Sequence, residues 1–120
     1  MLRQTTDFLV RTIGLVLISS AYFWQFNALT VIDLFGIANP NVDKAALGPA
    51  IGCRNAAAGI MLLVLSLQGH RQLAGVFLFV WVTLVGPEDI FLCIKDDTSW
   101  TTHAVNLGIG WTLSVLSWYT

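Results

Sequence analysis

Six polar residues interrupt segments of this chain that are otherwise apolar, and their types suggest acid–base chemistry. They form three pairs: Arg54 and Asn55, Glu88 and Asp89, and His103 and Asn106. A carboxyl group in low-dielectric surroundings can keep its proton and donate it, and a nearby histidine can accept or relay a proton. An arginine can hold a neighbouring carboxylate in its ionised form. This set suits the isomerisation, cyclisation or epoxide opening of an apolar substrate, with no cofactor required.

The same residues also allow a purely structural interpretation. Arg54 can form a buried ion pair with Glu88 or Asp89 that fixes how the helices pack, because charges inside a membrane usually find partners. Glu88 and Asp89 are adjacent and point about 100° apart on a helix, so we expect only one of them to face the cluster. One histidine and two acids on three segments lack a recognisable metal-ligand spacing, so we expect no metal site.

The segments that carry these residues are long and apolar. Hydrophobic residues make up 56% of the 120-residue chain and charged residues only 11%, whereas a soluble domain has about 25% charged residues. A membrane-spanning helix needs about 20 mostly apolar residues. Four stretches meet this requirement, at residues 8–26, 47–67, 73–94 and 100–119. We therefore predict an all-α fold, a four-helix transmembrane bundle that forms a single domain over residues 1–120.

Short connections make neighbouring helices antiparallel, and this arrangement brings the three polar pairs to one depth. With a rise of about 1.5 Å per residue, each pair lies roughly 5 to 10 Å from the same end of the bundle. His103, Asn106 and Gly110 follow at spacings of three and four, so they share one face of the last helix. The sequence thus predicts one polar cluster inside the bundle, whichever way the protein is oriented.

The connections predict further features of the topology. The apolar segment 28–37 is too short to span again and is expected to be interfacial or re-entrant, before a linker at 39–44. Arg3, Arg11 and Arg71 lie on the side of the termini, so the positive-inside rule places both termini in the cytoplasm. The net charge of −1 offers no basic stripe for nucleic acid.

Small residues predict where the helices approach closely. They recur at spacings of four and three along the second span, at Gly48, Gly52, Ala56 and Gly59. Gly108 and Gly110 offer a similar surface on the last span. Such faces also allow a homodimer. Cys53 and Cys93 are interpreted as two buried thiols, with a disulfide between them as the less favoured alternative.

From about Asp33 onward, the chain resembles a family of small four-helix membrane proteins catalogued only as a domain of unknown function. The resemblance rests on short elements along the chain: Phe35-Gly36, Gly52-Cys-Arg54-Asn55, Gly59, Gly69-His-Arg71, Gly75, Glu88-Asp89 and His103. The family usually has an acidic residue where this chain has Asn55, which weakens any role for a carboxylate there. A looser similarity links the chain to DoxX-like proteins.

The resemblance implies an enzyme of secondary metabolism. Such proteins are frequent in fungi and occur in natural-product gene clusters, where small membrane proteins act as cyclases, isomerases or epoxide hydrolases. By analogy, Glu88, Asp89 and His103 are the expected catalytic residues, and Arg54, Asn55 and Asn106 the expected substrate-binding residues. The expected substrate is a lipophilic polyketide or terpenoid, and the expected location is the endoplasmic reticulum membrane.

A second hypothesis remains open at this stage. The glycine-lined faces and the lack of a sizeable soluble part also fit a non-catalytic subunit that assembles with a partner membrane protein. A transporter or channel is less favoured, because one four-helix bundle has too little wall for a pore and shows no internal repeat.

Overall fold

A computed structural model describes residues 1–35, 37 and 40–120 of the chain. Every regular element in these ranges is a helix. Their bounds are Leu2–Phe26 for α1, Ala28–Phe35 for α2, Val42–Ala45 for α3, Gly48–Leu67 for α4, Arg71–Lys95 for α5 and Thr101–Tyr119 for α6. The predicted all-α fold with four long helices is therefore confirmed. Gly36 and Asn39, which belong to the predicted interfacial segment and linker, lie outside the described residues.

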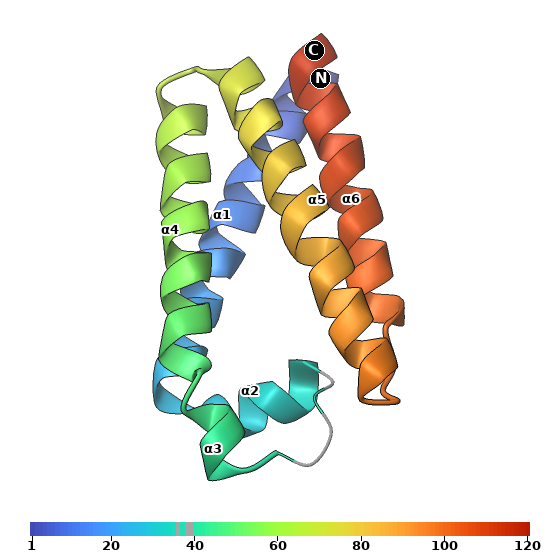
Figure 1. Ribbon diagram of the computed structural model, residues 1–120. Helices are drawn as coiled ribbons and strands as arrows, with labels where there is room; N and C mark the ends of the chain where they lie inside the picture. Colours follow the sequence, from blue (N-terminus) through green and yellow to red (C-terminus); the bar gives the residue numbers. More distant parts are fainter. Residues whose placement is uncertain (36, 38–39) are drawn as a thin grey trace.

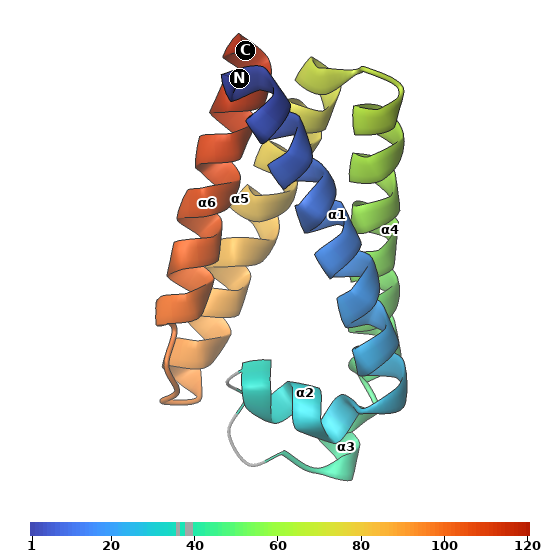
Figure 2. The same cartoon turned by 180° about the vertical axis from the view of Figure 1, so that it is seen from behind.

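The four long helices form two antiparallel pairs that meet at one end and separate at the other. Helix α1 packs against α4, and α5 packs against α6. The pairs converge where both termini lie and spread apart towards the opposite end, where α2 and α3 lie across the opening (Figure 1). The view from behind shows α1 running diagonally from the C-terminal end of α6, beside the N-terminus, to the lower part of α4 (Figure 2). We call these regions the terminal end and the open end.

The ends of the helices follow from local chain chemistry. Pro49 lies in the first turn of α4, where its missing N–H would have no helical partner. Gly69 follows α4 with a φ of 80°, and the next amide, that of His70, donates to the carbonyl of Leu65. This hydrogen bond satisfies a carbonyl left free by the end of the helix. Asp97 ends α5 in the same way with a φ of 55°, a conformation that aspartate tolerates.

The predicted close approach between helices is confirmed for α1 and α4. A Cβ atom on Gly59 would collide with the carbonyl oxygen of Gly14 on α1. One on Gly52 would lie 3.0 Å from the carbonyl oxygen of Ala21. Gly110 on α6 packs tightly against Val82 of α5 in a comparable way, whereas a Cβ on Gly108 would meet nothing within 4 Å. Gly108 is thus not a packing position within this chain.

The dimensions and composition of the helices fit a membrane protein. Three helical segments are long and apolar enough to cross a membrane, at Leu2–Phe26, Val42–Leu67 and Arg71–Lys95. The longest dimension of the molecule is 44 Å, which is close to the thickness of a bilayer with its headgroup regions, about 40–45 Å. Helix α6 is 19 residues long and is not among these three. The chain is therefore an integral membrane protein.

Two details differ from the sequence prediction. Helix α1 begins at Leu2 instead of near residue 8, and the hydroxyls of Thr5 and Thr6 donate to carbonyls one turn back in this added stretch. The two cysteines are free, and only Cys93 is buried while Cys53 is exposed. The interpretation of two buried thiols was therefore wrong for Cys53, which lies on the outer face of α4.

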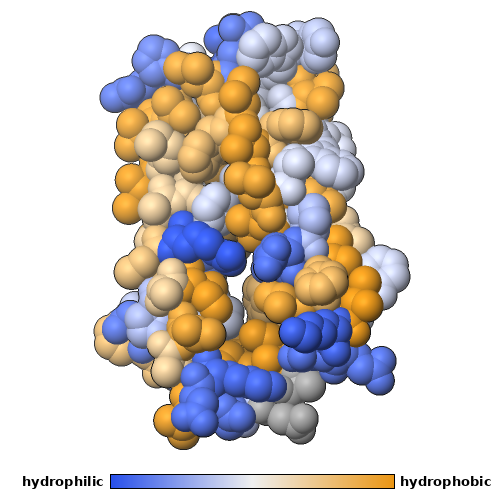
Figure 3. Space-filling model, in the orientation of Figure 1, coloured by the Kyte–Doolittle hydropathy of each residue, from blue (hydrophilic) through white to orange (hydrophobic). Residues whose placement is uncertain are grey.

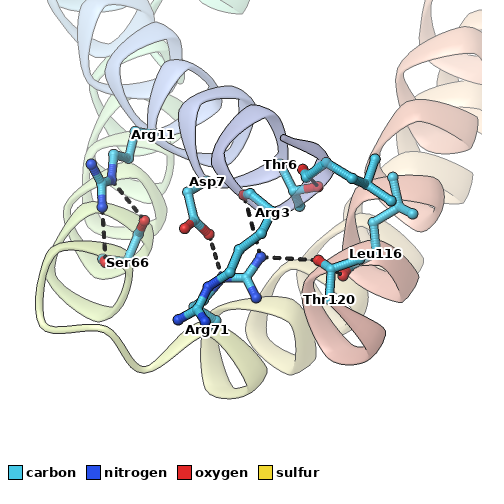
Figure 4. A network of polar contacts seen from close by, with 9 residues as sticks. Arg3, Thr6, Asp7, Arg11, Ser66, Arg71, Leu116 and Thr120 are labelled. Atoms are coloured by element: carbon cyan, nitrogen blue, oxygen red, sulfur yellow. Dashed lines mark hydrogen bonds and ion pairs between the residues drawn. The ribbon is translucent and has the colours of Figure 1, made fainter.

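Side chains of α1, α5 and α6 are bonded together at the terminal end. Arg71 forms an ion pair with Asp7 and donates to the hydroxyl of Thr120 at 3.0 Å (Figure 4). Arg11 donates to the hydroxyl of Ser66 at 3.0 Å, which ties α1 to α4 (Figure 4). A core of Val10, Leu62, Ala74, Leu78 and Leu113 joins all four long helices. These contacts hold the two pairs together at this end.

Candidate functional site

A cavity of about 740 Å³ lies between the two helix pairs towards the open end. Residues of α1, α2, α4, α5 and α6 line it, and most of them are apolar. In the space-filling view, hydrophilic side chains flank an opening in this half of the molecule (Figure 3). A mostly apolar pocket with a few convergent polar groups is the usual form of a small-molecule site.

Five of the six polar residues singled out in the sequence line this cavity. They are Arg54, Asn55, Asp89, His103 and Asn106. Glu88 is the exception, because it is exposed and absent from the lining. The structure thus answers which acid of the adjacent pair faces the cavity: it is Asp89, which is buried to 8% exposure. A catalytic role for Glu88 inside the cavity is not supported by its position.

Asp89 and His103 form the central pair of the site. The Oδ2 atom of Asp89 lies 3.8 Å from Nδ1 of His103, and both side chains are 12% exposed. This separation is longer than a hydrogen bond. An oxygen atom of a bound molecule can therefore lie to one side of the pair, within hydrogen-bonding distance of both groups.

A backbone carbonyl fixes the orientation of His103. Its Nε2 atom lies 2.9 Å from the carbonyl oxygen of Phe35, at the end of α2. A carbonyl only accepts hydrogen bonds, so Nε2 carries the proton and the lone pair of a neutral ring lies on Nδ1. The Phe35 ring also packs against the imidazole with a centroid distance of 4.5 Å. The basic nitrogen is therefore directed at Asp89.

Arg54 faces the same cavity from α4 but has no comparable partner. Its Nε atom is buried and makes no hydrogen bond. Neither the ion pair of Arg71 with Asp7 nor that of His103 with Asp89 includes Arg54. The buried ion pair between Arg54 and an acid of α5, which the structural interpretation required, is therefore not formed. The guanidinium instead lies over the ring of Trp81, 5.7 Å from its centroid.

The two asparagines have different roles in the packing. Asn55 donates from Nδ2 to the hydroxyl of Ser20 at 3.0 Å, which links α4 to α1 across the cavity wall. Asn106 lines the cavity one turn after His103, as the helical spacing predicted. Its side chain is exposed, so it remains available to a bound molecule.

Sequence reasoning missed three contributors to the site. Phe35 acts through its backbone carbonyl, which leaves no signal in the sequence. Trp81 lies eight residues before Asp89 and lines the cavity with it; the helical period would have placed both on one face. Ser20 directly follows Ser19 in α1, and nothing in the sequence shows which of the two hydroxyls meets Asn55.

Among the described residues, no group of three or more His, Cys, Asp or Glu side chains is placed to hold a metal ion. A family model described as a domain of unknown function, DUF4267, matches residues 14–120. No curated protein and no solved structure matches the chain.

Proposed function

Because this chain belongs to the DUF4267 family, a domain of unknown function, we propose its activity from the cavity itself: acid–base catalysis on a lipophilic small molecule within the membrane. The observation that carries the proposal is the Asp89–His103 pair, which lies 3.8 Å apart in a cavity of about 740 Å³. The reaction class is isomerisation, cyclisation or epoxide opening. From the resemblance to small four-helix membrane proteins of natural-product pathways, we infer that the substrate is a polyketide or terpenoid of secondary metabolism.

The geometry suggests how the pair would work. Protonated Asp89 donates its proton to a substrate oxygen, such as that of an epoxide or a carbonyl. His103 accepts a proton through Nδ1 from an attacking hydroxyl, a water molecule or an acidic C–H bond. The imidazolium of His103 then faces the carboxylate of Asp89 and returns a proton to it through an oxygen atom that contacts both groups. The cycle is redox-neutral, and it leaves both side chains as they began.

The carbonyl of Phe35 supports this cycle. It accepts a hydrogen bond from the Nε2–H group, which is present both in the neutral ring and in the imidazolium. The ring of His103 therefore keeps its orientation when its charge changes. Phe35 lies at the end of α2, and its ring also contacts Trp24 at a centroid distance of 5.7 Å. Helix α2 therefore covers the cavity and orients the base at the same time.

The proposal is tested by replacing the gene in the native host and profiling lipophilic metabolites. Asp89→Asn and His103→Ala should remove a product and accumulate its precursor, with the amount of folded membrane protein unchanged. Glu88→Gln is the matched control, because its carboxyl group is exposed and does not line the cavity. Identical profiles from all variants would contradict the proposal.

The second candidate, a non-catalytic subunit, draws on a different surface. An apolar hollow of about 550 Å³ lies between α1 and α6, and Gly108 lines it with open space beside its Cα. A helix of another membrane protein could approach closely there. Gly108→Leu should then disrupt an assembly seen by cross-linking, while Asp89→Asn leaves it intact.

A further inference from the structure

The unpartnered arginine at the open end carries information about the ligand. Arg54 lies in the membrane-spanning part of α4, lines the cavity, and has a buried Nε atom without a hydrogen-bond partner. Arginines at the terminal end differ, because Arg11 and Arg71 are both bonded to side chains of other helices. An unpaired cation at membrane depth is costly. The described chain therefore gives Arg54 no hydrogen bond and no ion pair, and only a longer-range attraction to Asp89 offsets its charge.

The neighbours of Arg54 leave its hydrogen-bonding edge free. Trp81 lies beside the guanidinium, 5.7 Å from Cζ to the ring centroid, and its indole offers no hydrogen-bond acceptor to the N–H groups. Asn55 is bonded to Ser20, and Asp89 lies beside His103. A planar guanidinium offers parallel N–H groups that match the two oxygens of a carboxylate.

We propose that the ligand of this cavity is an amphipathic monocarboxylate, held by its carboxylate group at Arg54 and by its apolar part between the helix pairs. The inference rests on the cavity being the substrate site proposed above. Two carboxyl groups, those of Asp33 and Asp89, line the same cavity as this one arginine. A group with two negative charges, such as a phosphate monoester, would exceed the one positive charge of Arg54 and be repelled by Asp33, and by Asp89 once it has given up its proton, whereas a single carboxylate matches the single cation.

The position of the carboxylate would also determine which atoms of the ligand lie at Asp89 and His103. The carboxylate of the ligand would lie at Arg54 on α4, whereas Asp89 and His103 lie on α5 and α6. The ligand would therefore span the space between the two helix pairs. The reacting atoms would then lie at a fixed number of bonds from the carboxylate. Neutral lipids of the bilayer have a similar apolar part but no carboxylate to bind Arg54. They would therefore bind the cavity more weakly, even where they are small enough to enter it.

The test compares two probes that differ only in the headgroup. The full chain is placed in nanodiscs of phosphatidylcholine, which carries no net charge. Palmitic acid with a diazirine in its chain and the matching hexadecanol are titrated, cross-linked by light and quantified by mass spectrometry on cavity peptides. The acid should saturate the cavity at a concentration at least about 10-fold below that of the alcohol, the effect expected of a charge-assisted pair.

Substitutions of Arg54 test whether this residue causes the preference for the acid over the alcohol. Arg54→Gln should reduce labelling by the acid to the level of the alcohol, and Arg54→Lys should give an intermediate result because it keeps the charge without the planar fork. Arg3→Gln is the matched control, since it removes an exposed arginine at the terminal end. The inference is overturned if both probes saturate the wild type equally, or if Arg54→Gln leaves the preference for the acid unchanged.

The design separates this inference from the proposed function. Binding of the acid should persist in Asp89→Asn and His103→Ala, because neither residue holds the carboxylate. If these variants bind the acid but also support normal metabolism, the acid–base function fails while the inference stands. If metabolism requires the pair but the wild type binds alcohol and acid equally, the inference alone fails. The wild-type comparison of the two probes decides the question even if Arg54→Gln does not fold.

Discussion

The two ends of this molecule use the same residue types in opposite ways. At the terminal end, Arg71 is 10% exposed and forms an ion pair with Asp7, and its guanidinium also donates to Thr120. At the open end, Arg54 faces a cavity with no ion pair to a described residue, and Asp89 lies 3.8 Å from His103. Both arginines lie among apolar helices. Only one of them has its partners supplied by the chain.

This difference separates a structural role from a binding role. A network whose donors and acceptors are satisfied holds helices together and offers nothing to a ligand. Charged groups that are left without partners at membrane depth are costly for the folded protein, and they are kept where function requires them. The terminal end therefore fixes the two helix pairs together, and the open end keeps polar groups free for a bound molecule.

Removing Arg71 should have the largest effect on stability. Arg71→Gln leaves the carboxylate of Asp7, which is 24% exposed, without its partner, and we expect a loss of about 3 kcal/mol. The measurement is equilibrium unfolding in mixed micelles, followed by far-UV circular dichroism. Arg54→Gln is the counterpart at the open end and should change stability by less than about 1 kcal/mol, because the substitution removes no hydrogen bond or ion pair, only the contact with Trp81 and a longer-range attraction to Asp89. Equal losses in both variants would show that the two ends are not different.

The contrast between the ends also explains what the sequence could predict. Helix α4 was placed almost to the residue, at 47–67 against Gly48–Leu67, because polar and turn residues bound its apolar run on both sides. The convergence of Asp89 and His103 followed from helix length and antiparallel order alone. The sequence did not show which of Glu88 and Asp89 faces the cavity, because this depends on the rotation of α5 about its axis. Contacts such as that of Gly75 with Ser114 set this rotation.

Contacts made by tertiary structure were beyond sequence reasoning. The carbonyl of Phe35 reaches His103 only because α2 folds back beneath the bundle, at a separation of 68 residues along the chain. The absence of a partner for Arg54 was hidden for the same reason. The sequence contains acids at a suitable depth, and only the spread between the helix pairs shows that none of the described ones pairs with it.

The close contact within each helix pair should be more sensitive than the surface between pairs. Gly59→Ala places a methyl group against the carbonyl oxygen of Gly14, and neither backbone can yield without moving a helix. We expect a loss of about 2 kcal/mol in the same unfolding measurement. Gly108→Ala is the control on α6, where the new Cβ meets nothing within 4 Å, and helix propensity should raise stability by roughly 0.5–1 kcal/mol. A neutral result for Gly59→Ala would mean that α1 and α4 separate in the membrane.

The smallest effect should come from the second arginine of the terminal end. Ser66 is 4% exposed, and its hydroxyl accepts a hydrogen bond from Nε of Arg11 at 3.0 Å. Ser66→Ala removes this link between α1 and α4 but leaves the contact of Arg11 with the carbonyl of Ser66 at 3.4 Å. We therefore expect a loss of about 1 kcal/mol in unfolding free energy.

Ser114→Ala is the matched control for that substitution. Ser114 is equally buried, and its hydroxyl donates to the carbonyl of Gly110 within the same helix at 2.7 Å. Such a bond joins no two helices, so its loss should cost less than that of Ser66. If instead Ser66→Ala is the milder variant, Arg11 finds water or headgroups as readily as Ser66. The bonds of Arg71 would then alone distinguish the terminal end from the open end, and Arg11 would resemble Arg54 in having no essential partner in the chain.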